Sequence, residues 1–443
     1  MPTAQRDPVV GDKLLERFDD ARRKSDALFQ IVRSEALYDR PIPERHRIIF
    51  YIGHLEAFDW NLLREALLGL KPFNSEFDRL FAFGIDPVGG GLPTDQVSDW
   101  PSLERVREYV QGVRSSLDEK LSENFDAHLA ARDGFRLDVL LNVAIEHRLM
   151  HVETLAYMLH QLPLNRKISR PAPAFPSLSV VSHSMVKILA GDATLGLSRS
   201  SESFGWDNEF ESHTVHVPAF EIDRYMVTNQ QFLEFLQARG YESRDLWSDQ
   251  DWQWKDHQQI SHPVFWNKNG ESWLYRTMFD EIPLPADWPV YVSYAEAAAY
   301  ARWAGKLLPT EEQWHRAAFG TPEGRRRQYP WGDEPPTPTR GNFDFYSFDP
   351  QPVNAHPPGQ SAFGVEGLLG NGWEWTSSVF APFPDFRPFP FYRGYSADFF
   401  DGKHFVMKGG SVRTAACMLR PTFRNWFQGH YQYVYAGFRC VNP

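Results

Sequence analysis

The stretch IEHRLMHVETL, residues 145–155, decides how the first third of the chain is interpreted. Steps at helical periodicity through this stretch define one inward-facing stripe. Its members are Leu140, Ala144, His147, His151, Leu155 and Met158. The pattern predicts a buried helix with two imidazoles in the middle of its inner face. Because a buried imidazole must satisfy two ring nitrogens, two of them together need a structural or chemical reason.

Three further segments before residue 163 share this periodicity, and each has one apolar stripe. The four predicted helices cover residues 12–32, 43–70, 103–121 and 136–162. A long connection rich in Gly and Pro, residues 71–101, separates the second helix from the third. Four amphipathic helices of this length are what an antiparallel bundle requires. We therefore expect a four-helix bundle over residues 1–165.

The pattern changes after the last of these helices. Residues 166–178 lack periodicity and hold three prolines, which is typical of a linker. From 179 to 443, short β-like runs such as residues 405–412 alternate with two predicted helices, residues 229–238 and 293–304. Most of the 15 tryptophans lie in this half, so we expect a loop-rich domain whose core is filled by aromatic side chains. The fold class is therefore α+β.

Composition limits the partners of the chain. The 443 residues carry a formal net charge of −11, which argues against nucleic acid or an anionic membrane as a partner. The two cysteines cannot form a disulfide framework, and the polar N-terminus lacks an apolar leader segment. No apolar run approaches the ~20 residues that span a bilayer. These features favour a cytoplasmic protein.

The two histidines of the opening stretch are candidate metal ligands. His147 and His151 are four residues apart, so both project from one helical face. His54, in FYIGHLEAFDW on the second predicted helix, is a third candidate. Three neutral imidazoles suit catalytic zinc or non-haem Fe(II), and ligand type alone does not decide between these ions. The alternative is that each is a core histidine hydrogen-bonded to a neighbour.

One carboxylate lies beside these histidines in the sequence. Glu153 follows His151 by two residues, which is about 200° around a helix. It is therefore expected to support a ligand from outside the coordination sphere, or to lie at the surface, rather than to bind the same ion.

The second half of the chain resembles the formylglycine-generating-enzyme, or sulfatase-modifying-factor, fold, a C-type-lectin-like domain. The matching segments include GLLGNGWEWTSS and RPTFRNWF and occur in the expected order over 179–443. The helical half resembles the DinB-type bundle, in which HxxxHxE (His147, His151, Glu153) and an upstream histidine (His54) form a three-histidine iron site. The two domains in this order resemble the ergothioneine sulfoxide synthases.

That resemblance implies an activity and a substrate. Members of the family are oxidoreductases that use Fe(II) and O2 to join sulfur to Cε1 of hercynine, which is trimethylhistidine. The Asn-Trp of the RNW motif lies at the hercynine site and corresponds to Asn425 and Trp426. Aromatic faces suit the quaternary ammonium of hercynine. A Gln that touches the substrate imidazole in many members, in HEQQHQE, is Met150 here, where the chain reads HRLMHVE.

The departures from the family pattern concern the chalcogen donor. In family members with an amino-acid donor, an Asp and an Arg bind the charged groups of that donor. The corresponding residues here are Phe427 and Tyr431. Because a zwitterionic donor would leave its charges unpaired, these aromatic residues favour a neutral sugar-borne donor, as in the selenoneine synthase branch. Arg413 is a candidate for restoring an anion contact. A Tyr that delivers a proton in the family corresponds to Phe380, so Tyr431 or Tyr433 is the candidate proton donor.

The leading hypothesis is therefore Fe(II)- and O2-dependent C–Se bond formation between hercynine and a selenosugar, in selenoneine biosynthesis. An ergothioneine sulfoxide synthase using cysteine or γ-glutamylcysteine is the first alternative, and a thiol or selenol dioxygenase is the second. A non-catalytic binding protein is a third. Copper-dependent formylglycine formation is disfavoured because Cys417 and Cys440 are 23 positions apart, and both are predicted to be small buried hydrophobic residues.

Overall fold

The chain divides into two compact units, Met1–Arg170 and Pro171–Pro443. The computed structural model describes residues 8–64, 70–82, 93–124, 136–170 and 181–443. The division falls within the predicted linker, 166–178, of which residues 171–178 lie outside the described residues. The domain bounds 1–165 and 179–443 therefore stay predictions, whereas the α+β class, with a helical unit followed by a mixed one, is confirmed.

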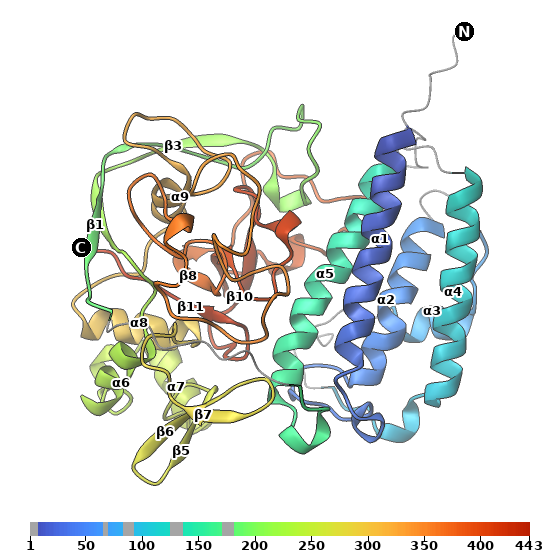
Figure 1. The fold of residues 1–443 in the computed structure, drawn as a ribbon, viewed down its shortest axis with the longest axis horizontal. Coiled ribbons are helices and arrows are strands. Elements are labelled where there is room, and N and C mark those ends of the chain that lie inside the picture. Colours follow the sequence, from blue (N-terminus) through green and yellow to red (C-terminus); the bar gives the residue numbers. More distant parts are fainter. Residues whose placement is uncertain (1–7, 65–69, 83–92, 125–135, 171–180) are drawn as a thin grey trace. The chain divides into compact units, whose positions relative to one another are not determined.

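The first unit is a helical bundle, as the sequence predicted (Figure 1). Its helices are α1 (Pro8–Phe29), α2 (Ile48–Leu63), α3 (Ser75–Leu80), α4 (Leu103–Asn124) and α5 (Leu137–Gln161). Helix α5 packs against α1 and α2, and α2 also packs against α3 and α4. The short helix α3 was not predicted; the side chain of Asn74 caps it by accepting from the backbone N–H of Glu76 and Phe77.

Helices α2 and α5 are buried on all sides rather than along one stripe. Of the 25 residues of α5, 20 are buried, and 13 of the 16 residues of α2 are buried. The prediction of a single apolar stripe is wrong for both, because each packs against at least two other helices. As a consequence, several charged residues of these helices lie in the interior of the bundle.

The second unit contains four helices among the described residues. They are α6 (Asn229–Gln237), α7 (Asp249–His257), α8 (Tyr294–Trp303) and α9 (Glu311–Phe319). The two predicted helices correspond to α6 and α8, and the prediction missed α7 and α9. Helix α9 begins with a capping box, in which Thr310 and Gln313 bond reciprocally to each other's backbone N–H. The T-x-x-Q spacing that signals this start was present in the sequence.

Four small sheets complete the second unit. The strands are β1 (Met185–Ile188), β2 (Gly191–Leu195), β3 (His213–Val217), β4 (Phe220–Asp223), β5 (Trp266–Asn269), β6 (Ser272–Arg276), β7 (Glu281–Pro283), β8 (Gly372–Val379), β9 (His404–Gly410), β10 (Asn425–Gln428) and β11 (Ala436–Gly437). They pair as β1-β4, β2-β3, β5-β6-β7 and β10-β9-β8-β11. In the last sheet β8, β9 and β10 are antiparallel and β11 is parallel to β8. Strand β10 is thus an edge strand of this sheet.

Aromatic side chains fill the core of the second unit, as predicted. The fully buried tryptophans are Trp206, Trp266, Trp314, Trp373 and Trp375. Arg439 is also fully buried and makes two hydrogen bonds to Glu374, at 2.6 and 2.7 Å. Trp373, Trp375 and Arg439 thus pack in the interior of this unit. Cys440 is buried as predicted, but Cys417 is only half-buried, so that prediction is wrong for Cys417.

Within the parts of the chain that the structure describes, no helix has both the length and the apolar character needed to cross a membrane.

Candidate functional site

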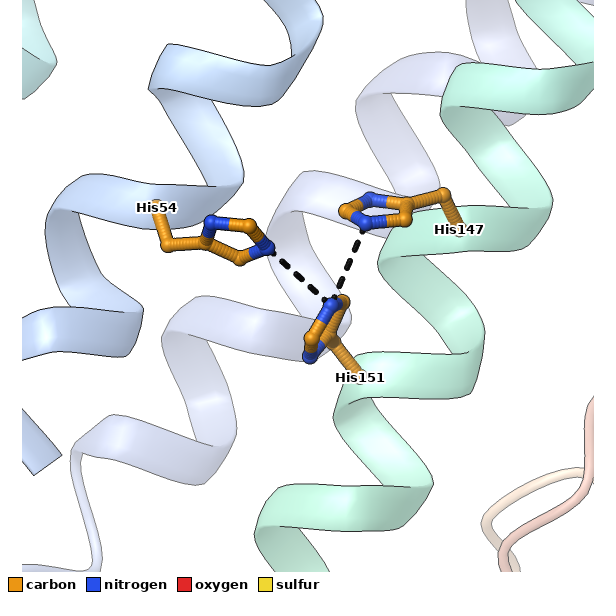
Figure 2. A group of neighbouring side chains, drawn as sticks. All are labelled: His54, His147 and His151. Carbon is orange, nitrogen blue, oxygen red and sulfur yellow. Dashed lines mark hydrogen bonds between the residues drawn. The ribbon is translucent and has the colours of Figure 1, made fainter. Parts of the chain in front are cut away.

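Three histidines of the bundle point their rings toward one another (Figure 2). His54 comes from α2, and His147 and His151 come from successive turns of α5. The Nε2 atom of His151 lies 3.2 Å from Nε2 of His54 and 3.2 Å from Nε2 of His147. The ligand atoms of all three residues lie within 4.8 Å of one another. The structure therefore brings together the three residues that the sequence predicted as metal ligands.

Burial keeps these imidazoles neutral. Their exposed fractions are 3% for His54, 4% for His147 and 1% for His151. Burial lowers the pKa of His54 to about 4, and burial, together with the neighbouring histidines, holds the pKa of His147 and of His151 well below the usual value of 6.5. A neutral imidazole keeps a lone pair on one nitrogen, and this is the form that binds metals.

The tautomer of His54 is set by a backbone carbonyl. Its Nδ1–H donates to the carbonyl oxygen of Phe81 at 2.7 Å, so that the lone pair is on Nε2, which faces the other two rings. Gly53 permits this contact, because a Cβ at that position would lie 2.5 Å from the ring of Phe81. The close approach of Phe81 to α2 thus orients the first of the three nitrogens.

Two of the three spacings between the nitrogens fit a shared ion. Two imidazole nitrogens at about 2.1 Å from one ion lie about 3.0 Å apart at a right angle and about 3.4 Å apart at the tetrahedral angle. The two Nε2–Nε2 distances of 3.2 Å fall between these values. Without a cation, an N–H on His151 can donate to only one of its two neighbours, so the two short contacts cannot both be hydrogen bonds. The donor set therefore fits a divalent ion such as Zn²⁺ or Fe²⁺.

Aromatic rings surround the three histidines. The ring of Phe58 stacks on His147 with centroids 3.4 Å apart, and that of Phe50 stacks on His54 at 4.8 Å. Tyr51 lies against His151 at 5.9 Å. These contacts restrict the rotation of the imidazoles and exclude water from this side of the cluster. None of the three aromatic residues was predicted, although all lie within five residues of His54 in the sequence.

The two other bundle residues assigned a role by sequence lie on α5. Met150 is half-buried, between the two histidines in the chain. Glu153 is buried, so it is not a surface group, and its support of a metal ligand stays a prediction. Charged residues that sequence reasoning missed also lie inside the bundle: Arg148, Glu56 and Asp59 are all buried beside the ligand positions.

In the second unit, the predicted hercynine residues begin strand β10. Asn425 pairs with Met407 of β9, and its Oδ1 accepts from the backbone N–H of Trp426 at 2.9 Å. Two ion pairs fix the segment that precedes the strand. Arg420 pairs with Glu209, and Arg424 donates to both carboxylate oxygens of Glu311, at 3.0 and 3.1 Å.

Trp426 lies in a cluster of aromatic rings. Phe380 stacks on it with centroids 4.2 Å apart and planes at 5°. Tyr395 meets it edge-on at 5.4 Å, and Phe399 lies at 5.7 Å. Trp426 remains half-buried, so part of its surface is open. Because side chains alternate along a strand, Trp426 and Asn425 project from opposite faces of β10, and a ligand at this edge would have to reach both.

The predicted donor residues form a second aromatic cluster. Phe427 stacks on Tyr431 at 5.1 Å, and Tyr433 meets Tyr431 edge-on at 5.5 Å. His430, which was not predicted, lies in the same turn. Its Nε2–H donates to Asp251 at 2.8 Å, and its ring is parallel to Trp254 at 4.7 Å. The carboxylate of Asp251 thus accepts the Nε2–H of His430 and fixes the orientation of its ring.

The third predicted donor residue, Arg413, contacts a pair of phenylalanines. Its guanidinium lies over the rings of Phe345 and Phe348, at 4.8 and 4.3 Å from their centroids. Nη1 also donates to the backbone carbonyls of Phe345 and Ser347. Arg413 is buried.

Comparison with known proteins agrees with this two-part organisation. Residues 173–443 match the family model of the sulfatase-modifying factor enzyme 1-like domain, and residues 17–155 match that of the DinB superfamily. Hercynine oxygenase from Mycobacterium tuberculosis is 43% identical over 250 residues, which is 56% of this chain and 58% of that protein. Its counterpart from Mycolicibacterium smegmatis is 38% identical over 345 residues, 76% of this chain and 77% of that protein.

A fungal protein is similar over nearly all of the chain. Ergothioneine biosynthesis protein 1 from Neurospora crassa is 28% identical over 93% of this chain, and the match covers 55% of the fungal protein. The chain thus spans a little over half the length of this relative and of the one from M. tuberculosis.

Proposed function

The chain belongs to the hercynine oxygenase family of enzymes, and on that premise we propose that it joins a chalcogen atom to Cε1 of hercynine with O2 as oxidant. The observation that carries this proposal is the convergence of three neutral imidazole nitrogens inside the bundle. Without an ion, only one hydrogen bond can form among these three nitrogens, because Nε2 of His54 is an acceptor and Nε2 of His151 is shared by both contacts. A bound metal ion would satisfy all three lone pairs.

We propose that His54, His147 and His151 hold Fe(II). Bound Fe(II) supplies the one-electron chemistry that allows O2 to react with closed-shell organic molecules. Three neutral ligands leave the charge of the ion uncompensated and leave coordination positions for substrates. The rings of Phe50 and Phe58 hold the imidazoles in place and keep water away from them, which limits unproductive oxidation.

The overall reaction balances without another reductant. The Cε1–H bond of hercynine and the X–H bond of the donor break, where X is Se or S, and a C–X bond forms. When the chalcogen retains one oxygen atom of O2, the other oxygen leaves with the two hydrogen atoms as water. The protein's own residues bind and orient the two substrates and deliver protons. We assign proton delivery to the phenol of Tyr431 or Tyr433.

Hercynine is assigned to Asn425 and Trp426, the first two residues of β10. The indole of Trp426, with Phe380, Tyr395 and Phe399 around it, suits a trimethylammonium group, because aromatic faces attract cations. The Asn425 side chain offers a polar contact at the same strand edge. Anchoring by Arg424 and Glu311 keeps this strand in place before a ligand binds.

The donor is assigned to the cluster of Phe427 and Tyr431. Their stacked rings offer apolar faces where family members with amino-acid donors have a carboxylate and a guanidinium. The guanidinium of Arg413 is already engaged by two carbonyls and two rings, which supports a donor without a carboxylate. His430, oriented by Asp251, offers Nδ1 for a hydrogen bond with a hydroxyl group. We therefore propose a neutral sugar-borne selenol as donor.

Competition between donors tests this choice. Iron-loaded protein is given hercynine, O2 and equal concentrations of a selenosugar and γ-glutamylcysteine, and products are identified by mass. Two lost charge-assisted hydrogen bonds cost about 1.5–3 kcal/mol each, so we expect the selenosugar to be preferred by about a hundredfold or more. A mainly sulfur-containing product would show that the enzyme is an ergothioneine-type sulfoxide synthase.

A double variant supplies the matched control. Phe427→Asp with Tyr431→Arg restores the two charges found in relatives that use amino-acid donors. We expect it to use γ-glutamylcysteine better and the selenosugar worse than the wild type. An unchanged ratio of the two products would remove this cluster from the donor site.

A further inference from the structure

A network of buried charges joins the two helices that carry the histidines. Arg148 of α5 and Glu56 and Asp59 of α2 have exposed fractions of 0%, 1% and 0%. Nη1 of Arg148 donates to Glu56 Oε1 at 2.9 Å, and Nη2 donates to Asp59 Oδ2 at 2.5 Å. The fork of one guanidinium thus holds two carboxylates that lie one turn apart on the neighbouring helix.

Arg148 also touches the backbone beside a histidine. Its Nη2 donates to the carbonyl oxygen of Leu55 at 3.1 Å. Leu55 follows His54 directly, and Arg148 follows His147 directly. One hydrogen bond therefore joins the residue that follows His54 on α2 to the residue that follows His147 on α5.

The network occupies a different side of α2 from the histidine. At about 100° per residue, Glu56 lies about 200° and Asp59 about 140° around α2 from His54. A change in the network therefore alters how α2 and α5 meet without removing a ligand or filling the space between the three rings. The two effects are separable by mutation.

Stability alone is a weak reason to bury these charges. Removing charged groups from water is costly, and well-packed apolar residues of similar volume often stabilise a fold as well as a buried ion pair does. What an apolar contact lacks is direction. Arg148 donates to three oxygens of α2 at once, and also to Oγ of Ser25 on α1 at 3.3 Å. Such a guanidinium defines the axial and rotational position of α2 relative to α5, whereas a lysine ammonium has no such planar fork.

We propose that Arg148 is a positioning residue for the metal site, which holds α2 against α5 so that Nε2 of His54 stays in reach of Nε2 of His151. The inference rests on the metal site of the proposed function, but not on the choice of substrate or donor. It predicts that the precise geometry of the three nitrogens depends on a side chain that touches neither the ion nor a substrate.

The test compares two identical substitutions in the full-length protein. Arg148→Lys keeps the charge and removes the fork. Arg22→Lys is the matched control, because Arg22 is a buried arginine of the same bundle whose ion pairs are with Asp19 and Asp118, on α1 and α4. Circular dichroism and urea unfolding of metal-free protein measure folding. Anaerobic Fe(II) titration against a chelator and the visible absorption of Co(II)-loaded protein measure the site.

We expect Arg148→Lys to remain folded, to bind Fe(II) ten- to a hundredfold more weakly than wild type, and to show an altered Co(II) spectrum. Arg22→Lys should match wild type in both metal measurements. Should Arg148→Lys fail to fold, the variant Arg148→Met with Glu56→Gln and Asp59→Asn leaves no unpaired charge, and the same weakening is expected. A folded variant of either kind with wild-type Fe(II) affinity and Co(II) spectrum overturns the inference.

The outcomes separate this inference from the proposed function. Wild-type protein that binds Fe(II) but does not modify hercynine would overturn only the proposed function. Weakened metal binding in Arg148→Lys would then still support the positioning role. Wild-type protein that binds neither Fe(II) nor Co(II) would overturn both.

Discussion

Burial of His54 makes the stability of the metal-free protein depend on pH. The folded protein lowers the pKa of His54 from its ordinary value of 6.5 to about 4, mainly because burial disfavours the charged ring. Between these two values the unfolded chain binds a proton that the folded chain does not. The stabilising contribution is therefore fully present above pH 6.5 and is lost as pH falls toward 4.

The size of this effect follows from the two pKa values. A shift of one unit corresponds to about 1.4 kcal/mol, so His54 accounts for about 3 kcal/mol over the whole window. Between pH 7 and pH 5 the same linkage gives a loss of about 2 kcal/mol. The change to measure is the difference in the free energy of unfolding between these two pH values, in urea, from the helical signal of circular dichroism.

His54→Gln removes the titrating ring. We expect the free energy of unfolding of this variant to fall by about 2 kcal/mol less than that of wild type between pH 7 and pH 5. His257→Gln, at an exposed position of α7, is the matched substitution and should behave as wild type. An equal loss of stability in wild type and in His54→Gln would refute the reasoning, because it would mean that His54 is not held neutral by burial.

Three further outcomes are expected. His151→Ala should abolish iron binding, measured by metal content, with the helical circular dichroism signal retained, because its Nε2 contacts both other histidines. Asn425→Ala should raise the KM for hercynine in steady-state kinetics while iron content stays that of wild type; an unchanged KM would remove Asn425 from the substrate site. Arg439→Met should lower the free energy of unfolding by about 3–5 kcal/mol in urea, because it leaves the buried carboxylate of Glu374 unpaired. A loss below 1 kcal/mol would contradict that account.

The three histidines were predictable because the information is local. His147 and His151 have the spacing of adjacent helical turns, and the apolar residues around them indicate an inner face. The contact of His54 with these two residues depends on the tertiary structure. The apolar segment FYIGHLEAFDW suggested that His54 is buried, and the structure shows that it faces His147 and His151. The assignment of metal to these residues comes from the resemblance and the chemistry of imidazole.

The charge network beside them was not predictable from periodicity. From the sequence, Arg148, Glu56 and Asp59 are expected to be exposed, because charged residues usually lie at the surface. Arg148 is 92 residues from Glu56 and 89 residues from Asp59 in the chain. Only the packing of α2 between α4 and α5 brings them together. A single sequence holds no signal for such pairs.

The short helix α7 was missed in the sequence analysis for a different reason. Helix α7, DQDWQWKDH, is too short and too polar to show an apolar stripe, and its start depends on a cap by Ser248. The cluster of Phe427, Tyr431 and Tyr433 was partly predictable, since the three residues lie close in sequence. The pairing of His430 with Asp251, 179 positions away, was not.

The most direct test of the central claim follows the hydrogen on Cε1 of hercynine. Hercynine carrying deuterium at Cε1 is incubated with iron-loaded protein, O2 and a selenosugar or thiol donor, and the product is analysed by mass spectrometry. We expect a product in which a chalcogen is bonded to the imidazole and the deuterium is lost, with no product from His151→Ala. Recovery of hercynine with its deuterium intact, while the donor is oxidised, would contradict the account and show that the protein is a thiol or selenol dioxygenase.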